Sequence, residues 1–122
     1  MIWKKSGGGV IINMGSTSWM IGQGGMPCYT TAKSAIQGLT RGLARDLSSK
    51  NIRVNCVVPG WIMTERQMSM WLTPESEQEL IERQCVKRKL IPEHIAKFVL
   101  FMASDEASAC SNQTYIVDGG FL

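Results

Sequence analysis

The sequence predicts an α/β fold and, within that class, half of a doubly wound parallel sheet. Short apolar runs alternate with helical segments in the order β-α-β-α-α-β. The runs are almost continuously apolar, which is typical of parallel strands that helices bury on both faces. Three strands are few for such a sheet, and both outer strands would expose apolar edges. The pattern therefore indicates part of a larger domain.

The first half of the chain predicts a strand, a loop and a long helix. Residues 10–14 (VIINM) form a short apolar run, and residues 15–26 are rich in Gly, Ser and Thr. Pro27 suits the first turn of a helix, where its missing N–H costs nothing. Apolar residues then recur every three or four positions to about residue 49, at Ala32, Ile36, Leu39, Leu43 and Leu47. All of these except Leu39 are expected to pack on the sheet.

The second half predicts two more strands, over residues 52–58 and 114–117. Residues 61–73 between them are expected to be irregular. Two helices are expected to begin at Pro74 and Pro92, since proline is common in a first helical turn. The earlier of these helices has acidic residues near its amino end and basic residues near its carboxyl end, as the helix dipole favours. The basic residues are Arg83, Lys87 and Arg88.

The chain has 122 residues, enough for one domain, and a formal net charge of +3. This charge is far below the concentrated positive charge of nucleic-acid or anionic-membrane binding, so neither partner is expected. The sequence contains no run of about 18 apolar residues, so no membrane-spanning helix is predicted. Hydrophobic residues make up 44% of the chain, which is enough to form a core and excludes wholesale disorder.

The cysteines indicate the compartment. Four of them, at positions 28, 56, 85 and 110, form no C-x-x-C pair, and the chain has one histidine, so no metal site is expected. Disulfides in a secreted domain are the alternative. Residues 1–7, however, lack the apolar core of a signal peptide. We therefore expect reduced, mostly buried thiols in a cytoplasmic protein.

Two polar side chains on the first helix could carry acid–base chemistry. Tyr29 and Lys33 are four residues apart, so they share a helix face, beside the stripe that packs on the sheet. A lysine ammonium favours the phenolate form of a nearby tyrosine, and such a pair can exchange a proton with a carbinol or carbonyl oxygen. Taken alone, this pair is more often an ordinary helix surface.

Residues at the predicted strand ends favour the chemical interpretation. Ser16 follows the first strand, where α/β proteins place functional groups, and its hydroxyl can orient a substrate oxygen. A loop serine that bonds to local backbone is the alternative. Pro59 and Gly60 end the second strand, and Thr64 follows. A small turn there lets the backbone and a hydroxyl approach a ligand.

Four segments together resemble the short-chain dehydrogenase/reductase family in order and spacing. They are residues 13–16 (NMGS), 29–33 (YTTAK), 55–64 (NCVVPGWIMT) and 118–120 (DGG). Family members are considerably longer, so the resemblance implies the carboxyl-terminal half of a Rossmann-like domain, with residues 1–122 as a partial domain. The glycine-rich cofactor turn, the N-N-A-G segment and a further catalytic asparagine would belong to the amino-terminal half.

The resemblance also implies roles for individual residues. Tyr29 would be the general acid/base, Ser16 would bind the substrate oxygen, and Lys33 would favour the phenolate and hold the nicotinamide ribose. Further contacts with NAD or NADP are implied for Tyr29 itself and for Pro59, Gly60, Ile62 and Thr64. Most of the pyrophosphate site would lie in the other half, so cofactor binding is expected of the longer parent more than of this chain alone.

A narrower resemblance lies in the family's variable substrate loop. Residues 61–67 (WIMTERQ), 71–74 (WLTP) and 84–90 (QCVKRKL) are similar to bacterial aldose 1-dehydrogenases. This similarity implies oxidation of a sugar, with Trp61 and Trp71 beside Ser16 at the substrate, and aromatic platforms suit sugar rings. Ordinary lid packing is the alternative use of these side chains. The alternative functions are a 3-oxoacyl or other carbonyl reductase and, in a different class, a catalytically silent fragment that associates only through its helices.

The helix expected over residues 27–49 has a second face of small residues, namely Thr31, Ala35, Gly38 and Gly42. A glycine inside a helix costs roughly 1 kcal/mol relative to alanine, so two of them need a reason. Close approach of another helix is one reason, and chance tolerance is the alternative. Because enzymes of this family commonly pair this helix, the resemblance implies a homo-oligomer formed through it.

Overall fold

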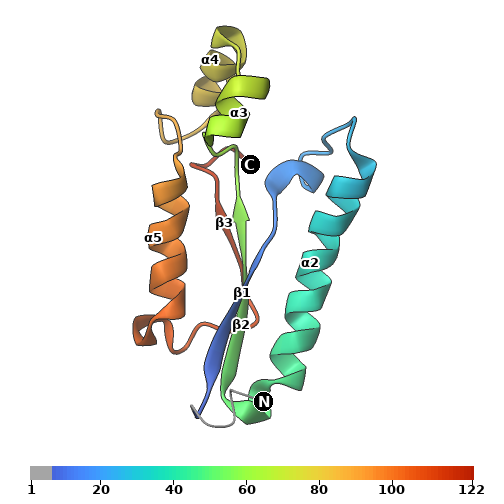
Figure 1. Ribbon diagram of the computed structural model, residues 1–122, viewed down its shortest axis with the longest axis vertical. Helices are drawn as coiled ribbons and strands as arrows, with labels where there is room; N and C mark the ends of the chain where they lie inside the picture. The colour runs from blue at the N-terminus through green and yellow to red at the C-terminus, as the bar shows by residue number, and fades with distance from the viewer. Residues whose placement is uncertain (1–6) are drawn as a thin grey trace.

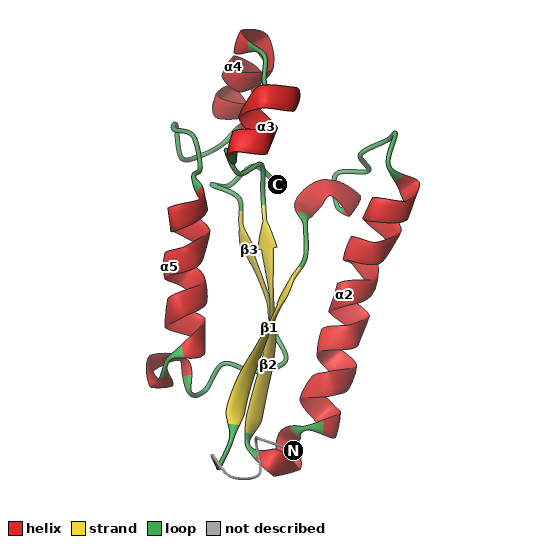
Figure 2. Cartoon of the chain, viewed as in Figure 1, coloured by secondary structure: helices red, strands yellow, loops and turns green. Residues whose placement is uncertain are grey.

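The computed structural model describes residues 7–122 and shows a parallel sheet of three strands between two long helices (Figure 1). The strands are β1 (Gly9–Met14), β2 (Ile52–Pro59) and β3 (Thr114–Val117), in the order β1-β2-β3. Figure 2 shows α2 (Pro27–Asp46) on one side of the sheet and α5 (Pro92–Ala103) on the other. The predicted α/β class and partial parallel sheet are confirmed. Residues 1–6, which carry most of the signal-peptide prediction, lie outside the described part.

The central strand β2 holds the core. All its side chains from residue 54 to residue 58 are fully buried, because β1 and β3 flank the strand and helices cover its faces. Complete burial of one aliphatic side chain stabilises a fold by about 1.5–3 kcal/mol, so this strand contributes heavily. Ile52 and Val54 pack with Ala44 of α2 and with Ile11 of β1.

The face that α2 turns to the sheet differs from the prediction. Thr40 and Ala44 are buried, whereas Ala32 is exposed and Leu39 is 50% exposed. The hydroxyl of Thr40 accepts a hydrogen bond from Asn13 Nδ2 on β1 at 2.9 Å. This polar contact, with the small side chain of Ala44, brings the helix close to the sheet. The expected stripe is therefore wrong at Ala32.

The connection from β2 to β3 contains one more helix than predicted. α3 (Glu65–Met70) lies inside the segment that was expected to be irregular, and α4 (Pro74–Arg83) follows it. Lys87 and Arg88 follow Arg83, the last residue of α4, so they lie near its carboxyl end, as predicted, but outside the helix itself. The Nζ of Lys87 nevertheless donates to the carbonyl of Glu82 at 2.7 Å, which satisfies one of the free carbonyls of that helix end.

Other element boundaries agree with the prediction to within one or two residues, apart from the end of α2. That helix stops at Asp46, and a 3₁₀ turn over Ser48–Lys50 replaces its expected last turn. Asn51 then adopts a left-handed conformation with φ of 53°, which redirects the chain into β2. No helix within residues 7–122 is both long and apolar enough to cross a membrane.

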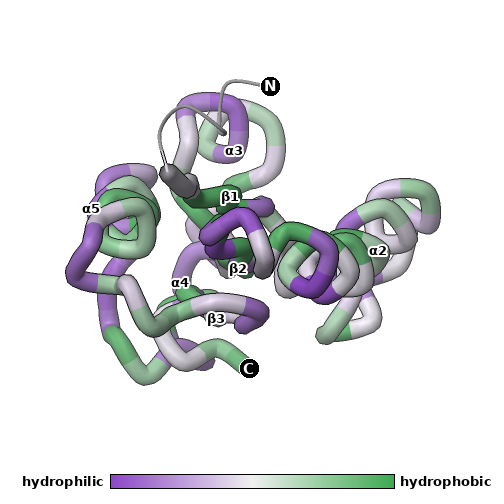
Figure 3. The backbone as a smooth tube through the Cα atoms, turned by 90° about the horizontal axis from the view of Figure 1, so that it is seen from below, coloured by the Kyte–Doolittle hydropathy of each residue, from purple (hydrophilic) through white to green (hydrophobic). Residues whose placement is uncertain are grey.

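The crossover from β1 to β2 and the crossover from β2 to β3 have opposite handedness, because their helices α2 and α5 lie on opposite faces of the sheet. Figure 3, seen along the strands, places α2 and α5 on opposite faces. The strands follow one another in a single direction across the sheet, so one crossover must depart from the right-handed rule. The second connection is the longer one, and it carries α3 and α4 to the carboxyl end of the strands (Figure 1). α3 and α4 therefore lie beyond the carboxyl ends of the strands, where a site is expected.

All four cysteines carry free thiols, but they are not mostly buried as predicted. Cys56 is buried on β2 and Cys110 is half-buried, whereas Cys28 and Cys85 are exposed. Cys28 lies in the first turn of α2, and Cys85 follows α4. The apolar character of a cysteine side chain did not decide its burial here.

Arg53 of β2 should make a large contribution to stability. Its guanidinium donates to three carbonyls at the end of α5 and beyond it, those of Ser104 at 2.9 Å, Met102 at 3.0 Å and Cys110 at 3.2 Å. Hydrogen bonds to a charged group contribute about 1.5–3 kcal/mol, and Arg53→Met would remove all three, although the Cys110 carbonyl would keep its bond from Asn55 Nδ2 at 2.7 Å. We expect urea unfolding to show a loss of about 3 kcal/mol. Arg41→Met, on the exposed side of α2, is the control and should change stability by less than about 0.5 kcal/mol.

Candidate active site

The carboxyl ends of the three strands meet at one edge, and most of the candidate residues gather around it. β1 continues into Gly15 and Ser16, and β2 continues into Gly60. The first turns of α2, which carry Tyr29 and Lys33, lie beside this same end of the sheet (Figure 1). Ligands of open parallel sheets bind beyond the carboxyl ends of the strands.

Lys33 connects the end of β1 to Tyr29. Its Nζ donates to the carbonyl oxygen of Met14, the last residue of β1, at 2.9 Å. The same Nζ lies 5.7 Å from the centre of the Tyr29 ring, within the range of a cation–π contact. Tyr29 itself is 46% exposed, so its hydroxyl remains open to a ligand. One ammonium group therefore fixes the spacing between helix and strand and places a positive charge beside the phenol.

Ser16 is held by a neighbour that sequence reasoning missed. It caps a short 3₁₀ helix (Thr17–Trp19), where its Oγ accepts from the backbone N–H of Ser18 at 3.2 Å. The Ser16 hydroxyl also donates to Ser18 Oγ at 3.0 Å. Local backbone bonding, the alternative for this serine, is thus present. The two bonds also fix the hydroxyl only two residues beyond the carbonyl that Lys33 binds. No sequence motif marks Ser18, since capping serines occur in many loops.

Two glycines allow the strand ends to pack closely. A Cβ atom on Gly15 would lie 2.9 Å from Val58 Cγ2, and one on Gly60 would lie 2.6 Å from Asp118 Cβ. Both distances are shorter than carbon atoms tolerate, so each position excludes any larger residue. Gly60 also donates its N–H to the carbonyl of Val117 at 3.1 Å. Glycine is therefore required at this position because the chain packs closely against the end of β3.

The turn after Gly60 offers an unused backbone donor at Ile62. Thr64 caps α3 by accepting from the N–H of Gln67 at 3.2 Å, which occupies its hydroxyl oxygen. Ile62 forms an isolated parallel bridge with Leu90, through the N–H of Met63 at 2.7 Å from the Leu90 carbonyl. In the described part of the chain, nothing accepts the N–H of Ile62. Among the residues predicted to contact cofactor here, Ile62 has the free donor.

The two candidate tryptophans differ in how they are held. Trp61 is half-buried, and its Nε1 donates to Gln67 Oε1 at 2.9 Å. Trp71 is 59% exposed, and Met68 and Met70 of α3 are exposed as well. These three exposed side chains lie in α3 or directly after it. Sugar contact and ordinary lid packing stay the two alternatives for this segment.

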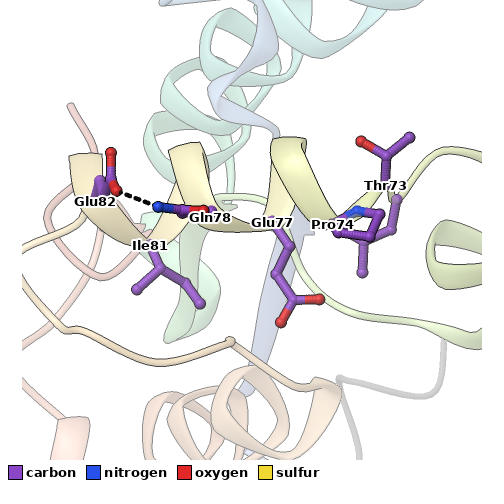
Figure 4. Close-up of a pocket in the computed structure, with 7 residues that line it drawn as sticks. Thr73, Pro74, Glu77, Gln78, Ile81 and Glu82 are labelled. Atoms are coloured by element: carbon purple, nitrogen blue, oxygen red, sulfur yellow. Dashed lines mark hydrogen bonds between the residues drawn. The ribbon is translucent and has the colours of Figure 1, made fainter.

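A groove beside α4 does not belong to this constellation. Figure 4 shows side chains that line it and the hydrogen bond from Gln78 Nε2 to Glu82 Oε1, which is 2.9 Å long. Its lining residues all come from α4 and the segment just before it, so Ser16, Tyr29 and Lys33 take no part in it. The lining consists of Leu72, Thr73, Pro74, Glu77, Gln78, Ile81 and Glu82.

The Cys56 thiol near Lys33 is uncharged. Burial raises the pKa of the Cys56 thiol, and weaker opposing effects come from the Gly15 backbone, Thr40 and Lys33. Cys56 is therefore a neutral thiol at neutral pH, and the Lys33 charge remains available to Tyr29. Within residues 7–122, no three His, Cys, Asp or Glu side chains gather to hold a metal ion.

The DGG segment organises the last residues of the chain. The buried carboxylate of Asp118 accepts from the N–H groups of Gly120 at 2.8 Å and Leu122 at 3.0 Å. The carbonyl of Gly119 in turn accepts from the N–H of Val86 at 2.9 Å. Gly119 and Gly120 have φ of 72° and 74°, which favours glycine. The segment therefore ties the chain end to the loop after α4.

Comparison with known proteins agrees with this geometry. A family model described as enoyl-(acyl carrier protein) reductase matches residues 2–122. D-xylose 1-dehydrogenase of Caulobacter vibrioides is 49% identical over 118 residues, which are 97% of this chain and 47% of that protein. A probable galactose dehydrogenase of Rhizobium meliloti is 45% identical over 117 residues, 96% of this chain and 46% of that protein.

A solved structure gives the same result for the fold. A 7α-hydroxysteroid dehydrogenase, solved with NADH and 7-oxo glycochenodeoxycholic acid, superposes with a TM-score of 0.89 at 39% identity. The match covers 97% of this chain and 46% of that one. The chain therefore spans about half the length of the curated relatives that it matches.

Proposed function

Because this chain belongs to the short-chain dehydrogenase/reductase family, we propose that it is the catalytic half of a nicotinamide-dependent dehydrogenase that oxidises an aldose sugar. The observation that carries the proposal is Lys33, whose Nζ binds the carbonyl of Met14, two residues before Ser16, and lies 5.7 Å from the centre of the Tyr29 ring. The sugar is favoured because relatives named for xylose and galactose are 49% and 45% identical. A 3-oxoacyl reductase of Chlamydia trachomatis, the alternative, is 40% identical.

The residues of this chain suggest how the reaction would proceed. Ser16 would turn its hydroxyl hydrogen from Ser18 Oγ to the anomeric hydroxyl oxygen of the sugar and so fix the position of that oxygen. Tyr29 would act as the general base that removes the proton from that hydroxyl, and the oxygen would become the carbonyl oxygen of a lactone. Lys33 stabilises the phenolate by its charge. When bound, NAD or NADP accepts the hydride that leaves the anomeric carbon.

The free donor of Ile62 and the ammonium of Lys33 fit such a cofactor. An unpaired backbone N–H suits the carboxamide oxygen of a nicotinamide, and Lys33 retains two further N–H groups for ribose hydroxyls. Thr64 contributes less, because its hydroxyl oxygen already caps α3. Trp61 precedes α3 and Trp71 directly follows it, and α3 lies beyond the carboxyl end of β2 (Figure 1), so both side chains would contact a sugar ring bound there.

The proposal is tested by joining this chain to the half of the Caulobacter D-xylose 1-dehydrogenase that it does not match. The joined protein should oxidise xylose or galactose. The reaction would be measured by the absorbance of the reduced cofactor. The isolated chain should give no saturable fluorescence signal with NADH or NADPH, since most of the phosphate site would be absent. A joined protein that reduces a 3-oxoacyl thioester and ignores sugars would support the reductase alternative. A folded joined protein that binds no cofactor would support the silent fragment.

We also propose that the protein is a homo-oligomer formed through α2. Ala35, Gly38, Gly42 and Leu39 are exposed on this helix, and a Cβ atom on either glycine would meet nothing within 4 Å. The chain therefore leaves open space on this face for a second helix. Glycines that serve no contact within their own subunit gain a reason if another helix packs against them.

Gly38→Leu in the joined protein should convert the oligomer to monomer, because the leucine would fill the space of the second helix. Light scattering would show the mass fall to that of one chain. The variant should still fold, since the new side chain meets no atom of its own subunit at the Cβ position. Glu79→Leu on the exposed side of α4 is the matched control and should leave the mass unchanged. An unchanged mass for Gly38→Leu would place the interface elsewhere.

A further inference from the structure

Ser18, two residues after the proposed substrate ligand Ser16, carries a buried hydroxyl group. The residue is 5% exposed and belongs to the short 3₁₀ helix Thr17–Trp19. Its Oγ lies 3.0 Å from Ser16 Oγ, and this is the one hydrogen bond of the Ser18 hydroxyl within residues 7–122. A buried hydroxyl without a partner is costly, so the bond to Ser16 accounts for a serine at position 18.

The backbone of Ser18 is fixed independently of this hydroxyl. Its N–H group donates to Ser16 Oγ at 3.2 Å. Its carbonyl oxygen accepts from the N–H of Gln23 at 2.9 Å, a bond that closes the turn after the 3₁₀ helix. Removal of the Ser18 hydroxyl would therefore leave Ser18 and Ser16 in the same relative position.

The two serine hydroxyls can share their hydrogen bond in two ways. A serine oxygen has one hydrogen to donate and two lone pairs with which to accept. The N–H of Ser18 occupies one lone pair of Ser16 Oγ. At 3.0 Å either hydroxyl can donate to the other. When Ser18 is the donor, both lone pairs of Ser16 are filled, so Ser16 can only donate.

The proposed reaction requires the arrangement in which Ser18 is the donor. The anomeric hydroxyl gives its proton to Tyr29, so it has to accept a hydrogen bond from Ser16 and not donate one to it. A Ser16 oxygen with an open lone pair would compete with Tyr29 for the hydrogen of the sugar. Filled lone pairs prevent this competition, and they also strengthen Ser16 as a donor, because hydroxyls in a chain polarise one another.

We propose that Ser18 is a positioning residue that sets the direction of the Ser16 hydrogen bond, so that Ser16 donates to the oxygen of the reacting hydroxyl. This inference rests on the proposed function, because it needs Ser16 to bind the substrate. Ser18 itself touches neither sugar nor cofactor in this role. Its effect should be largest in the transition state, since a hydrogen bond donated to an oxygen strengthens as negative charge develops there.

Ser18→Ala in the joined protein removes the hydroxyl and keeps the backbone bonds. We expect kcat to fall about tenfold while the KM for the sugar changes by less than about twofold, because the lost effect acts mainly on the transition state. Ser18→Thr retains a hydroxyl and should restore most of the lost kcat. The matched control is Ser108→Ala, at an exposed position after α5, which should change neither constant.

A double-mutant cycle with Ser16→Ala separates positioning from a general effect on the fold. Ser18→Ala should lower kcat about tenfold when Ser16 is present and by less than about twofold when position 16 is alanine. Equal losses in both backgrounds, or no loss in either, would overturn the inference and leave the proposed function standing. A Ser16→Ala variant with normal kcat would contradict the role of Ser16 in the proposed function as well, so the two failures are distinguishable.

Neutron diffraction locates the hydrogen atoms directly and does not depend on turnover. Crystals of the joined protein would be grown with sugar and reduced cofactor, a pair that does not react. The hydrogen of Ser18 should be directed at Ser16 Oγ, and the hydrogen of Ser16 at an oxygen of the sugar. A Ser16 hydrogen that still points to Ser18 Oγ, or a Ser18 hydrogen directed at another acceptor, would overturn the proposal. This measurement decides the question if the variants at position 18 do not fold.

Discussion

Tyr29→Phe in the joined protein should reduce turnover by about 10²–10⁴-fold and leave cofactor affinity unchanged. The phenolic hydroxyl is the group that would exchange the proton, and phenylalanine lacks it. Lys33 is anchored on the Met14 carbonyl and not on the Tyr29 hydroxyl, so the substitution keeps the ammonium and the aromatic ring in place. The measurements are kcat at saturating sugar and the Kd of NADH by fluorescence titration.

The chain offers a matched control for this substitution. Tyr115, the other of its two tyrosines, lies on β3 and contacts the ring of Phe98 with 5.6 Å between ring centroids. Tyr115→Phe removes a phenolic hydroxyl from β3, outside the candidate site, and should leave kcat unchanged. Retention by Tyr29→Phe of more than about a tenth of wild-type turnover would contradict its role as the acid/base, since such groups contribute far more.

Much of the fold follows from the sequence because its strongest signals are local. The apolar run at residues 10–14 and the run at 52–58 ending in Pro59 correspond to β1 and β2 almost residue for residue. α3 was missed because it has six residues, too few for an apolar period to be visible. Its start depends on the Thr64 cap, which is a side-chain contact. Such contacts are weakly encoded in residue type.

The orientation of α2 shows where pattern alone fails. Residues three and four apart can define two overlapping faces, and the spacing gave Ala32 the same weight as Leu43, while Leu39 was expected off the sheet. The sheet selected the face that carries Thr40, because Asn13 on β1 supplies a hydrogen-bond donor at that point. Leu39 is left on the outer face. Tertiary contacts, which no periodicity contains, decided between the two.

The candidate site divides in the same way. A spacing of four places Tyr29 and Lys33 on one face, which the sequence predicts and the 5.7 Å contact agrees with. The acceptor of Lys33 could not be predicted, since it is a backbone carbonyl on a strand 19 positions earlier. Ser18 was missed for a related reason, because its partner Ser16 was considered only as a substrate ligand. Anchoring contacts depend on distances that the assembled sheet sets.

Lys33→Met should impair turnover and cofactor binding together, which separates its role from that of Tyr29. The substitution removes the charge that would stabilise the phenolate and the N–H groups proposed for the ribose, while methionine retains the apolar stem. Loss of one charge-assisted hydrogen bond costs about 1.5–3 kcal/mol, so the Kd of NADH should rise at least about tenfold. The expected fall in kcat is about 100-fold or more.

The control for this variant is Lys97→Met on the exposed side of α5, which removes an equal charge outside the candidate site. Both variants would be measured by NADH titration, by kcat and by urea unfolding. Lys33→Met should lower the unfolding free energy by only about 1 kcal/mol, since a single bond to the Met14 carbonyl is lost. A normal Kd with a lowered kcat would remove Lys33 from the cofactor site and leave it as the support of Tyr29. A normal kcat as well would reduce Lys33 to a strut between α2 and β1, and the proposed mechanism would fail at its anchoring residue.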